Sequence, residues 1–244
     1  MYKGFNLKLE IDSLTFYETG LELYSEYKGD VRCKLKDLTD SDGILDGSMI
    51  QSDWFPQVNA DIFLSHSHRD EKQAITLAGL LFKIFKIKTF IDSCVWGYAN
   101  DLIKMLDDKF CITNGSYASA SHVHMMLSTA LLKMIDKTEC LFFLNSPNSI
   151  SGSDIVNKTQ SPWIYSEIAM TQSIRTKEPS RYLPTQRLAL TDTSKNTSKP
   201  PIRYNVELAH LIDIDKTTIK EWLSNKYKNS GEALDRLYSI ASII

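Results

Sequence analysis

Short strand-like apolar runs alternate with longer helix-like runs from about residue 60 onward. The apolar runs predict strands over 61–67, 88–92, 139–146, 187–191 and 205–213. Helical spacing of apolar side chains predicts helices over 71–86, 101–110, 121–136, 216–227 and 230–243. Strands that alternate with helices form parallel sheets through right-handed crossovers. The pattern therefore predicts an α/β fold, a five-stranded parallel sheet with helices on both faces.

The first 58 residues carry a different pattern. The stretch "NLKLEIDSLTFYETGLELYSEYKGDVRCKL" alternates and is rich in Leu, Tyr, Phe and Val, which predicts two or three strands or a short hairpin. The stretch "DLTDSDGILDGSMIQSDW" is turn-rich and predicts a connector. We therefore expect a small β-rich N-terminal extension over 1–58, followed by the main domain over 59–244.

Charge and composition narrow the classes of protein. The 244 residues include 28 basic and 30 acidic side chains, a net charge of −2, which argues against a general nucleic-acid binder. No stretch approaches the roughly 20 apolar residues that span a bilayer, and no signal peptide is visible, so we expect no membrane partner and a cytoplasmic location. The four cysteines form no CxxC pair, which indicates reduced thiols, with Cys140 in a core strand.

The ends of the predicted strands carry the candidate chemistry, because parallel sheets bind ligands at the carboxyl ends of their strands. The first strand is followed by Ser65, His66 and Ser67, and the second by Asp92, Trp96 and Tyr98. Neither GxxxxGK[ST] nor GxGxxG occurs, which excludes the common phosphate-binding loops. His66 and His68 lack an obvious third ligand, so we expect no metal site.

A helix start follows the third strand. In "SPWIYSEIAM" Ser161 can cap the helix and Pro162 suits its first position. Trp163 and Glu167 are four residues apart and so share one helical face. The positive end of this helix is expected to favour the ionised form of Glu167.

Three of these stretches resemble the Toll/interleukin-1 receptor (TIR) family. "DIFLSHSHRD" is similar to its first-strand box, "FIDS" with "CVWGYANDL" to its second strand and functional loop, and "SPWIYSEI" to the Ser-x-Trp-x-x-x-Glu helix of its enzymatic members. The resemblance covers roughly 60–215. It implies a flavodoxin-like fold and is to standalone microbial members of the family rather than to receptor tails. The chain departs from the family pattern at His66, where an aromatic is usual, and at Ile164, where a small residue is common.

The resemblance also implies an activity. Many such domains cleave the nicotinamide–ribose bond of NAD+, which is their substrate, without a cofactor. The glutamate of the helix motif is essential and corresponds to Glu167. The product could be ADP-ribose, a cyclic isomer or a conjugate. The family further implies self-association through TIR domains, a downstream effector that responds to the nucleotide, and a setting in microbial anti-phage defence.

Each candidate residue would have a role in NAD+ cleavage, and most also have a structural alternative. Glu167 would stabilise positive charge on the ribose and Trp163 would shape the pocket wall beside it. Ser65, His66, Ser67 and Asp92 would contact substrate, or cap and turn the chain. Trp96 and Tyr98 would form a flap or an assembly contact, or anchor their loop to the core.

Two other functions fit the same sequence. The domain could be a non-catalytic scaffold that recruits TIR domains through the loop from Trp96 to Tyr98. It could also be a nucleoside deoxyribosyltransferase, a related flavodoxin-like enzyme with a glutamate nucleophile. A scaffold would keep its partners after Glu167 is replaced, and a deoxyribosyltransferase would form a covalent ribosyl adduct.

Overall fold

The centre of the protein is a parallel β-sheet. A computed structural model of the chain describes residues 1–9, 15–25, 44–96, 99–110, 118–150, 158–182 and 204–241. The sheet has five strands in the order β3-β2-β4-β1-β7, all parallel. They are β1 (Lys3–Leu7), β2 (Ile62–Ser65), β3 (Thr89–Phe90), β4 (Cys140–Leu144) and β7 (Ile212–Ile214). The predicted five-stranded parallel sheet is therefore confirmed.

The origin of one strand differs from the sequence expectation. β1 lies inside the sheet, paired with β4 on one side and with β7 on the other. The predicted boundary after residue 58 thus does not separate β1 from the sheet. The local alternation indicated a strand but carried no information on its partners, and β4 lies more than 130 residues further along the chain. The predicted strand at 187–191 falls outside the described residues.

Apart from β1, the described residues of 1–58 include two helices, so the prediction of strands was wrong over Tyr17–Ser25. α1 (Tyr17–Ser25) packs against α3 (Glu71–Phe85), and its Tyr24 is buried and donates to the Thr89 carbonyl at 2.6 Å. α2 (Gly47–Trp54) forms the last part of the stretch that was predicted to be a connector. It begins at Asp46, whose carboxylate accepts from the backbone N–H groups of Ser48 and Met49, a capping signal within "DGS".

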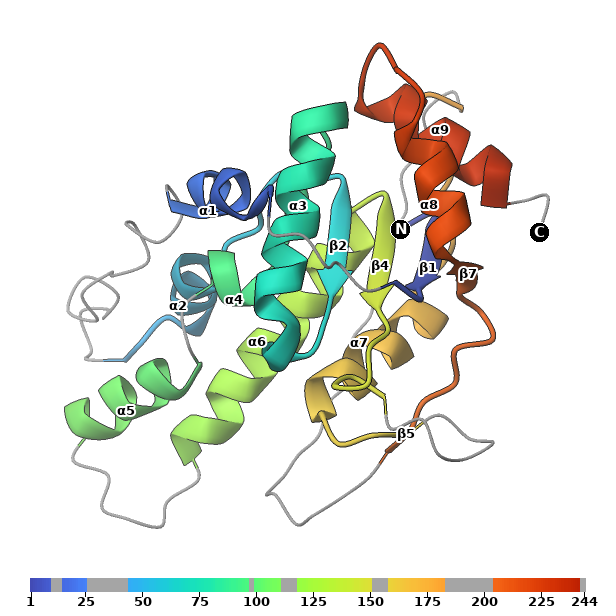
Figure 1. Cartoon of the computed structure of the whole chain (residues 1–244). Helices are drawn as coiled ribbons and strands as arrows, with labels where there is room; N and C mark the ends of the chain where they lie inside the picture. Colours follow the sequence, from blue (N-terminus) through green and yellow to red (C-terminus); the bar gives the residue numbers. More distant parts are fainter. Residues whose placement is uncertain are drawn as a thin grey trace.

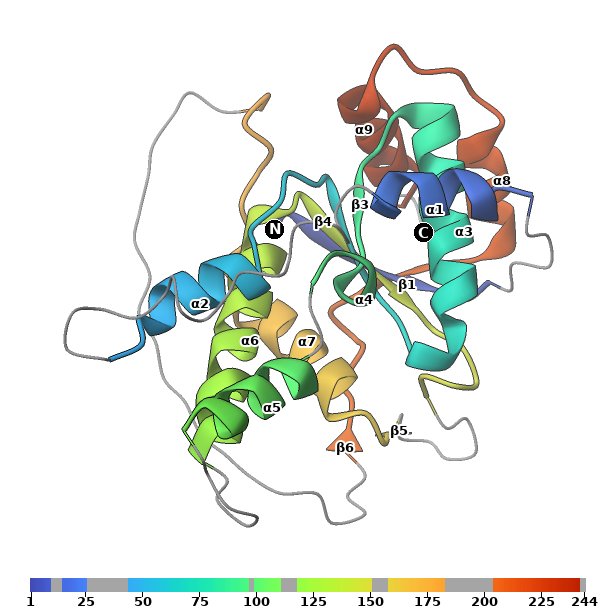
Figure 2. The same cartoon turned by 90° about the vertical axis from the view of Figure 1, so that its left-hand side faces the viewer.

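Helices cover both faces of the sheet, as predicted (Figures 1 and 2). One face carries α1 and α3 together with α8 (Lys216–Leu223) and α9 (Ser230–Ala241). The other face carries α2, α6 (Ala118–Lys137) and α7 (Pro162–Ser173), with α5 (Ala99–Lys109) packed on α6. A single turn of helix, α4 (Asp92–Val95), follows β3. Among the described helices, none is long and apolar enough to cross a membrane.

The strand predicted over 205–213 is interrupted. Only β6 (Tyr204–Asn205) and β7 are extended there, and the Leu211 amide donates to the Leu208 carbonyl at 2.9 Å in the turn between them. β6 pairs antiparallel with β5 (Lys158–Thr159), outside the main sheet. The apolar run thus contains a turn that brings Leu208 and Leu211 into the core.

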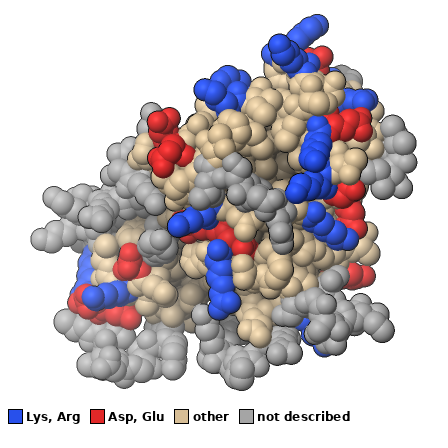
Figure 3. All heavy atoms as spheres, viewed as in Figure 1, with Lys and Arg blue, Asp and Glu red and all other residues tan. Residues whose placement is uncertain are grey.

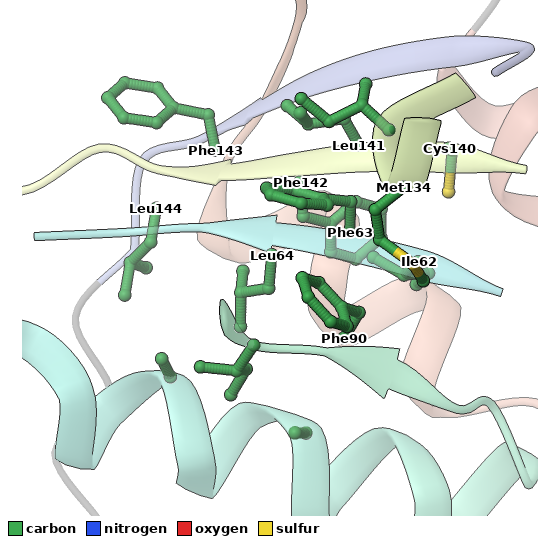
Figure 4. Packing of buried hydrophobic residues seen from close by; sticks show 14 of the residues in the cluster. Ile62, Phe63, Leu64, Phe90, Met134, Cys140, Leu141, Phe142, Phe143 and Leu144 are labelled. Carbon is green, nitrogen blue, oxygen red and sulfur yellow. The ribbon is translucent and has the colours of Figure 1, made fainter. Parts of the chain in front are cut away.

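β4 forms the middle of the core. All five of its residues are buried, including Cys140, which confirms the placement of that cysteine. Leu144 projects toward α3, whereas Leu141 and Phe143 project to the opposite side (Figure 4). Burial on both faces is typical of a parallel strand.

Candidate active site

The carboxyl ends of β2 and β3 meet α7 at a buried glutamate. The hydroxyl of Ser65, the last residue of β2, donates to Glu167 Oε2 at 2.5 Å. Ser65 is 1 % exposed and Glu167 is 4 % exposed. The start of α7 is as expected, with Ser161 as the cap accepting from the Ile164 amide and Pro162 in the first turn. The helix motif and the first-strand box are therefore joined by a direct hydrogen bond.

The environment of Glu167 favours its neutral form. Burial and, to a smaller extent, the negative charge of Asp92 together raise the pKa of Glu167 to about 8, and the hydrogen bond from Ser65 opposes this rise. The expected effect of the helix N-terminus is thus outweighed. Glu167 is the sixth residue of α7, and the influence of a helix end falls off within the first turn.

Asp92 is brought to the same place by the sheet. β2 and β3 pair Phe63 with Phe90, and each chain then runs two residues further to Ser65 and Asp92. Asp92 is half-buried and begins α4. The negative charge of Asp92 disfavours the ionised form of Glu167 in this partly dry site.

This arrangement predicts opposite shifts for two substitutions. Asp92→Asn removes a negative charge and lowers the pKa of Glu167, whereas Ser65→Ala removes a hydrogen bond to the carboxylate and raises it. NMR titration of the carboxyl carbon in protein labelled with ¹³C at glutamate measures both. The exposed Asp108→Asn serves as control and leaves the titration unchanged. Shifts of the same sign in the two variants would contradict this account.

Of the two candidates after Ser65, Ser67 has a structural role, whereas no structural role is found for His66 among the described residues. Ser67 caps the short 3₁₀ turn His68–Asp70, where its hydroxyl accepts from the Arg69 amide at 3.4 Å. Ser67 thus caps the chain, the alternative to substrate contact given above. His66 Nε2 is buried and has no hydrogen-bond partner in the described part of the chain. A buried nitrogen without a partner is costly, which keeps His66 as a substrate-binding candidate.

The aromatic candidates lie in different places. Trp163 is partly buried against the core, and its ring centroid lies 5.7 Å from that of His124 on α6. Trp96 is 7 % exposed, packs edge-on against Phe55 and Phe90, and donates its indole N–H to the Pro56 carbonyl at 2.9 Å. These contacts give Trp96 the anchoring role. Tyr98 lies outside the described residues.

A second buried carboxyl at this edge was not identified from the sequence as part of the site. Asp70 directly precedes α3, but its side chain makes no capping bond to that helix. It is 1 % exposed and accepts from the Ser146 hydroxyl at 2.5 Å and the Asn148 amide at 2.7 Å. Asp70 therefore ties the loop after β2 to the loop after β4. The signal was present in "NSPNS" directly after the central strand, where side-chain donors follow the apolar run.

The described part of the chain holds no group of three or more His, Cys, Asp or Glu side chains that could bind a metal ion. Comparisons of the chain with protein-family models, with curated proteins and with solved structures gave no match.

Proposed function

We propose that this protein is an NAD+-cleaving enzyme of the TIR type, which breaks the bond between nicotinamide and ribose. The observation that carries the proposal is the buried Glu167 carboxyl, held by Ser65 at the carboxyl end of β2 and faced by Asp92. A buried carboxyl with a raised pKa costs stability, and perturbed pKa values of this kind cluster at functional sites. The flavodoxin-like fold implied by the TIR resemblance also has a five-stranded parallel sheet, but its strand order is 2-1-3-4-5, whereas here the N-terminal strand β1 lies between β4 and β7.

The chemistry follows from charge. The nicotinamide ring of NAD+ is cationic and leaves without protonation, so the bond breaks through an oxocarbenium-like ribose. The positive ring entering beside Glu167 favours the ionised carboxylate, which then stabilises the charge that develops on the sugar. Asp92 accepts from the ribose hydroxyls. The low exposure of Glu167 limits water at the reacting carbon, a condition that cyclisation or conjugation requires.

The experiment is nicotinamide release from NAD+ by the full chain, followed by chromatography with mass detection at several protein concentrations and from pH 6 to 9. We expect kcat/KM to rise with pH as a group of pKa near 8 loses its proton, because the free protein holds Glu167 neutral. The masses of the other products separate hydrolysis from cyclisation and conjugation. A rise in rate with protein concentration indicates self-association. A rate that falls as the pH rises through 8 would contradict the role of the ionised carboxylate.

A further inference from the structure

The site around Glu167 is one end of a row of residues across the sheet. Phe143 of β4 pairs with Ser65 of β2 on one side and with Asn6 of β1 on the other, and Asn6 pairs in turn with Asp213 of β7. Residues opposite each other in neighbouring strands point to the same face. Ser65, Phe143, Asn6 and Asp213 therefore lie at one level on the α7 face. Asp213 is about 14 Å from Ser65, or three strand spacings.

The far end of this row carries a hydrogen-bonded polar network. Asn6 is 3 % exposed, donates to Asp213 Oδ1 at 2.6 Å and accepts from the Asn145 amide at 3.0 Å. Lys8, just beyond β1, donates to Asp213 Oδ2 at 2.5 Å. A buried amide inside an otherwise apolar strand is costly unless it is fully bonded, and here it fixes the carboxylate of Asp213.

The charged groups of this network face solvent. The side chains of Lys8 and Asp213 are 54 % and 57 % exposed. Although burial raises the pKa of Asp213, the hydrogen bonds from Lys8 and Asn6 hold it below its ordinary value. Each carboxylate oxygen accepts one bond and has a second acceptor site, and the ammonium retains two donors. The network therefore presents both an anionic acceptor and a cationic donor at the carboxyl edge. Over the face seen in Figure 3, basic and acidic side chains are interspersed in the same way.

We infer that Lys8 and Asp213 form a second subsite, which binds the adenosine-side ribose and phosphate of the dinucleotide whose reacting ribose lies at Glu167. This inference rests on the proposed function. The Asp213 carboxylate accepts from the vicinal hydroxyls of the ribose, and the Lys8 ammonium contacts the phosphate. Phe143 and Asn6 in the middle of the row are buried, so an extended dinucleotide would span the distance outside the row, along the carboxyl edge of the sheet.

The test separates this subsite from a cross-strand ion pair that serves only the sheet. Lys8→Gln and Asp213→Asn are compared with Lys177→Gln. Lys177 pairs with Asp136 and is 53 % exposed, but it lies near Met1 at the opposite, amino edge of the sheet. Binding of ADP-ribose to the full chain is measured by calorimetry at two salt concentrations. Nicotinamide release is measured from NAD+ and from nicotinamide riboside, which lacks the adenosine half.

We expect Lys8→Gln and Asp213→Asn each to weaken ADP-ribose binding about tenfold, the effect of one lost charge-assisted hydrogen bond. They should raise KM for NAD+ by a similar factor, with kcat and the turnover of nicotinamide riboside unchanged. Lys177→Gln should behave as wild type. Equal ADP-ribose binding by Lys8→Gln and Lys177→Gln would overturn the subsite, as would a wild-type protein that does not bind ADP-ribose.

The two proposals fail separately. If wild-type protein releases nicotinamide but the Lys8 and Asp213 variants match it in KM and binding, the subsite is wrong and the activity stands. If wild-type protein binds ADP-ribose through Lys8 but releases no nicotinamide, the subsite stands as a nucleotide site and the cleavage activity is wrong.

Discussion

Glu167→Gln should make the protein more stable at neutral and alkaline pH while removing its activity. In the unfolded chain this carboxyl ionises near 4.5, whereas in the folded protein its pKa is about 8. Between these values the unfolded chain has lost the proton that the folded protein still holds, so the free energy of unfolding falls as pH rises. Each pH unit costs about 1.4 kcal/mol, which sums to about 4 kcal/mol at pH 8.

Glutamine is neutral, similar in shape, and can still accept from Ser65, so it escapes this cost. The gain should be absent at pH 4.5 and grow to an increase in melting temperature of the order of 10 °C at pH 8 to 9. Thermal unfolding across this pH range measures it, with the exposed Glu178→Gln as control. A difference between wild type and Glu167→Gln that does not change with pH would contradict the buried, neutral carboxyl. A gain in stability on replacing Glu167 would be an example of the trade-off between activity and stability that is common at functional sites.

Gly79→Ala should destabilise the protein by about 3 kcal/mol, at the upper end of the range for overpacking in a core. A Cβ on Gly79 of α3 would lie 2.1 Å from the Phe16 carbonyl oxygen and 2.7 Å from the Gly20 nitrogen. Both are backbone atoms, so α1 as a whole would have to move away. The buried hydrogen bond of Tyr24 to β3 would be lost with it.

The matched control is Gly231→Ala in the first turn of α9. A Cβ there would meet only side-chain atoms, the nearest at 3.3 Å. In a helix alanine is favoured over glycine by up to about 1 kcal/mol, so this variant should be neutral or slightly more stable. Chemical denaturation of the two variants gives the comparison. Equal stability of Gly79→Ala and wild type would mean that α1 does not pack closely on α3.

The main strands and helices from β2 to α7 could be predicted from the sequence, because each carries a signal in its own residues. The helical spacing in 71–86 and 121–136 and the cap at Ser161 each identify an element from its own residues. The rule that ligands bind at the carboxyl ends of parallel strands placed Ser65 and Glu167 at one edge of the sheet, but the hydrogen bond between them was not predicted.

Long-range pairing was beyond those patterns. "KGFNL" reads as a strand, but nothing in it indicates that it enters the sheet between β4 and β7. Consequently Asn6 and Lys8 were not recognised as neighbours of the strand ends. The raised pKa of Glu167 could not be predicted from the sequence either, because its burial and the approach of Asp92 depend on the completed fold.

The proposed role of Glu167 in NAD+ cleavage is tested by comparing two proteins. Nicotinamide release is measured at pH 8 for wild type and for Glu167→Gln, with the fold of both confirmed by circular dichroism. We expect release by wild type and a loss of about 100-fold or more in the variant, typical of removing a group that stabilises charge in the transition state. A folded Glu167→Gln protein that releases nicotinamide at the wild-type rate would contradict the account.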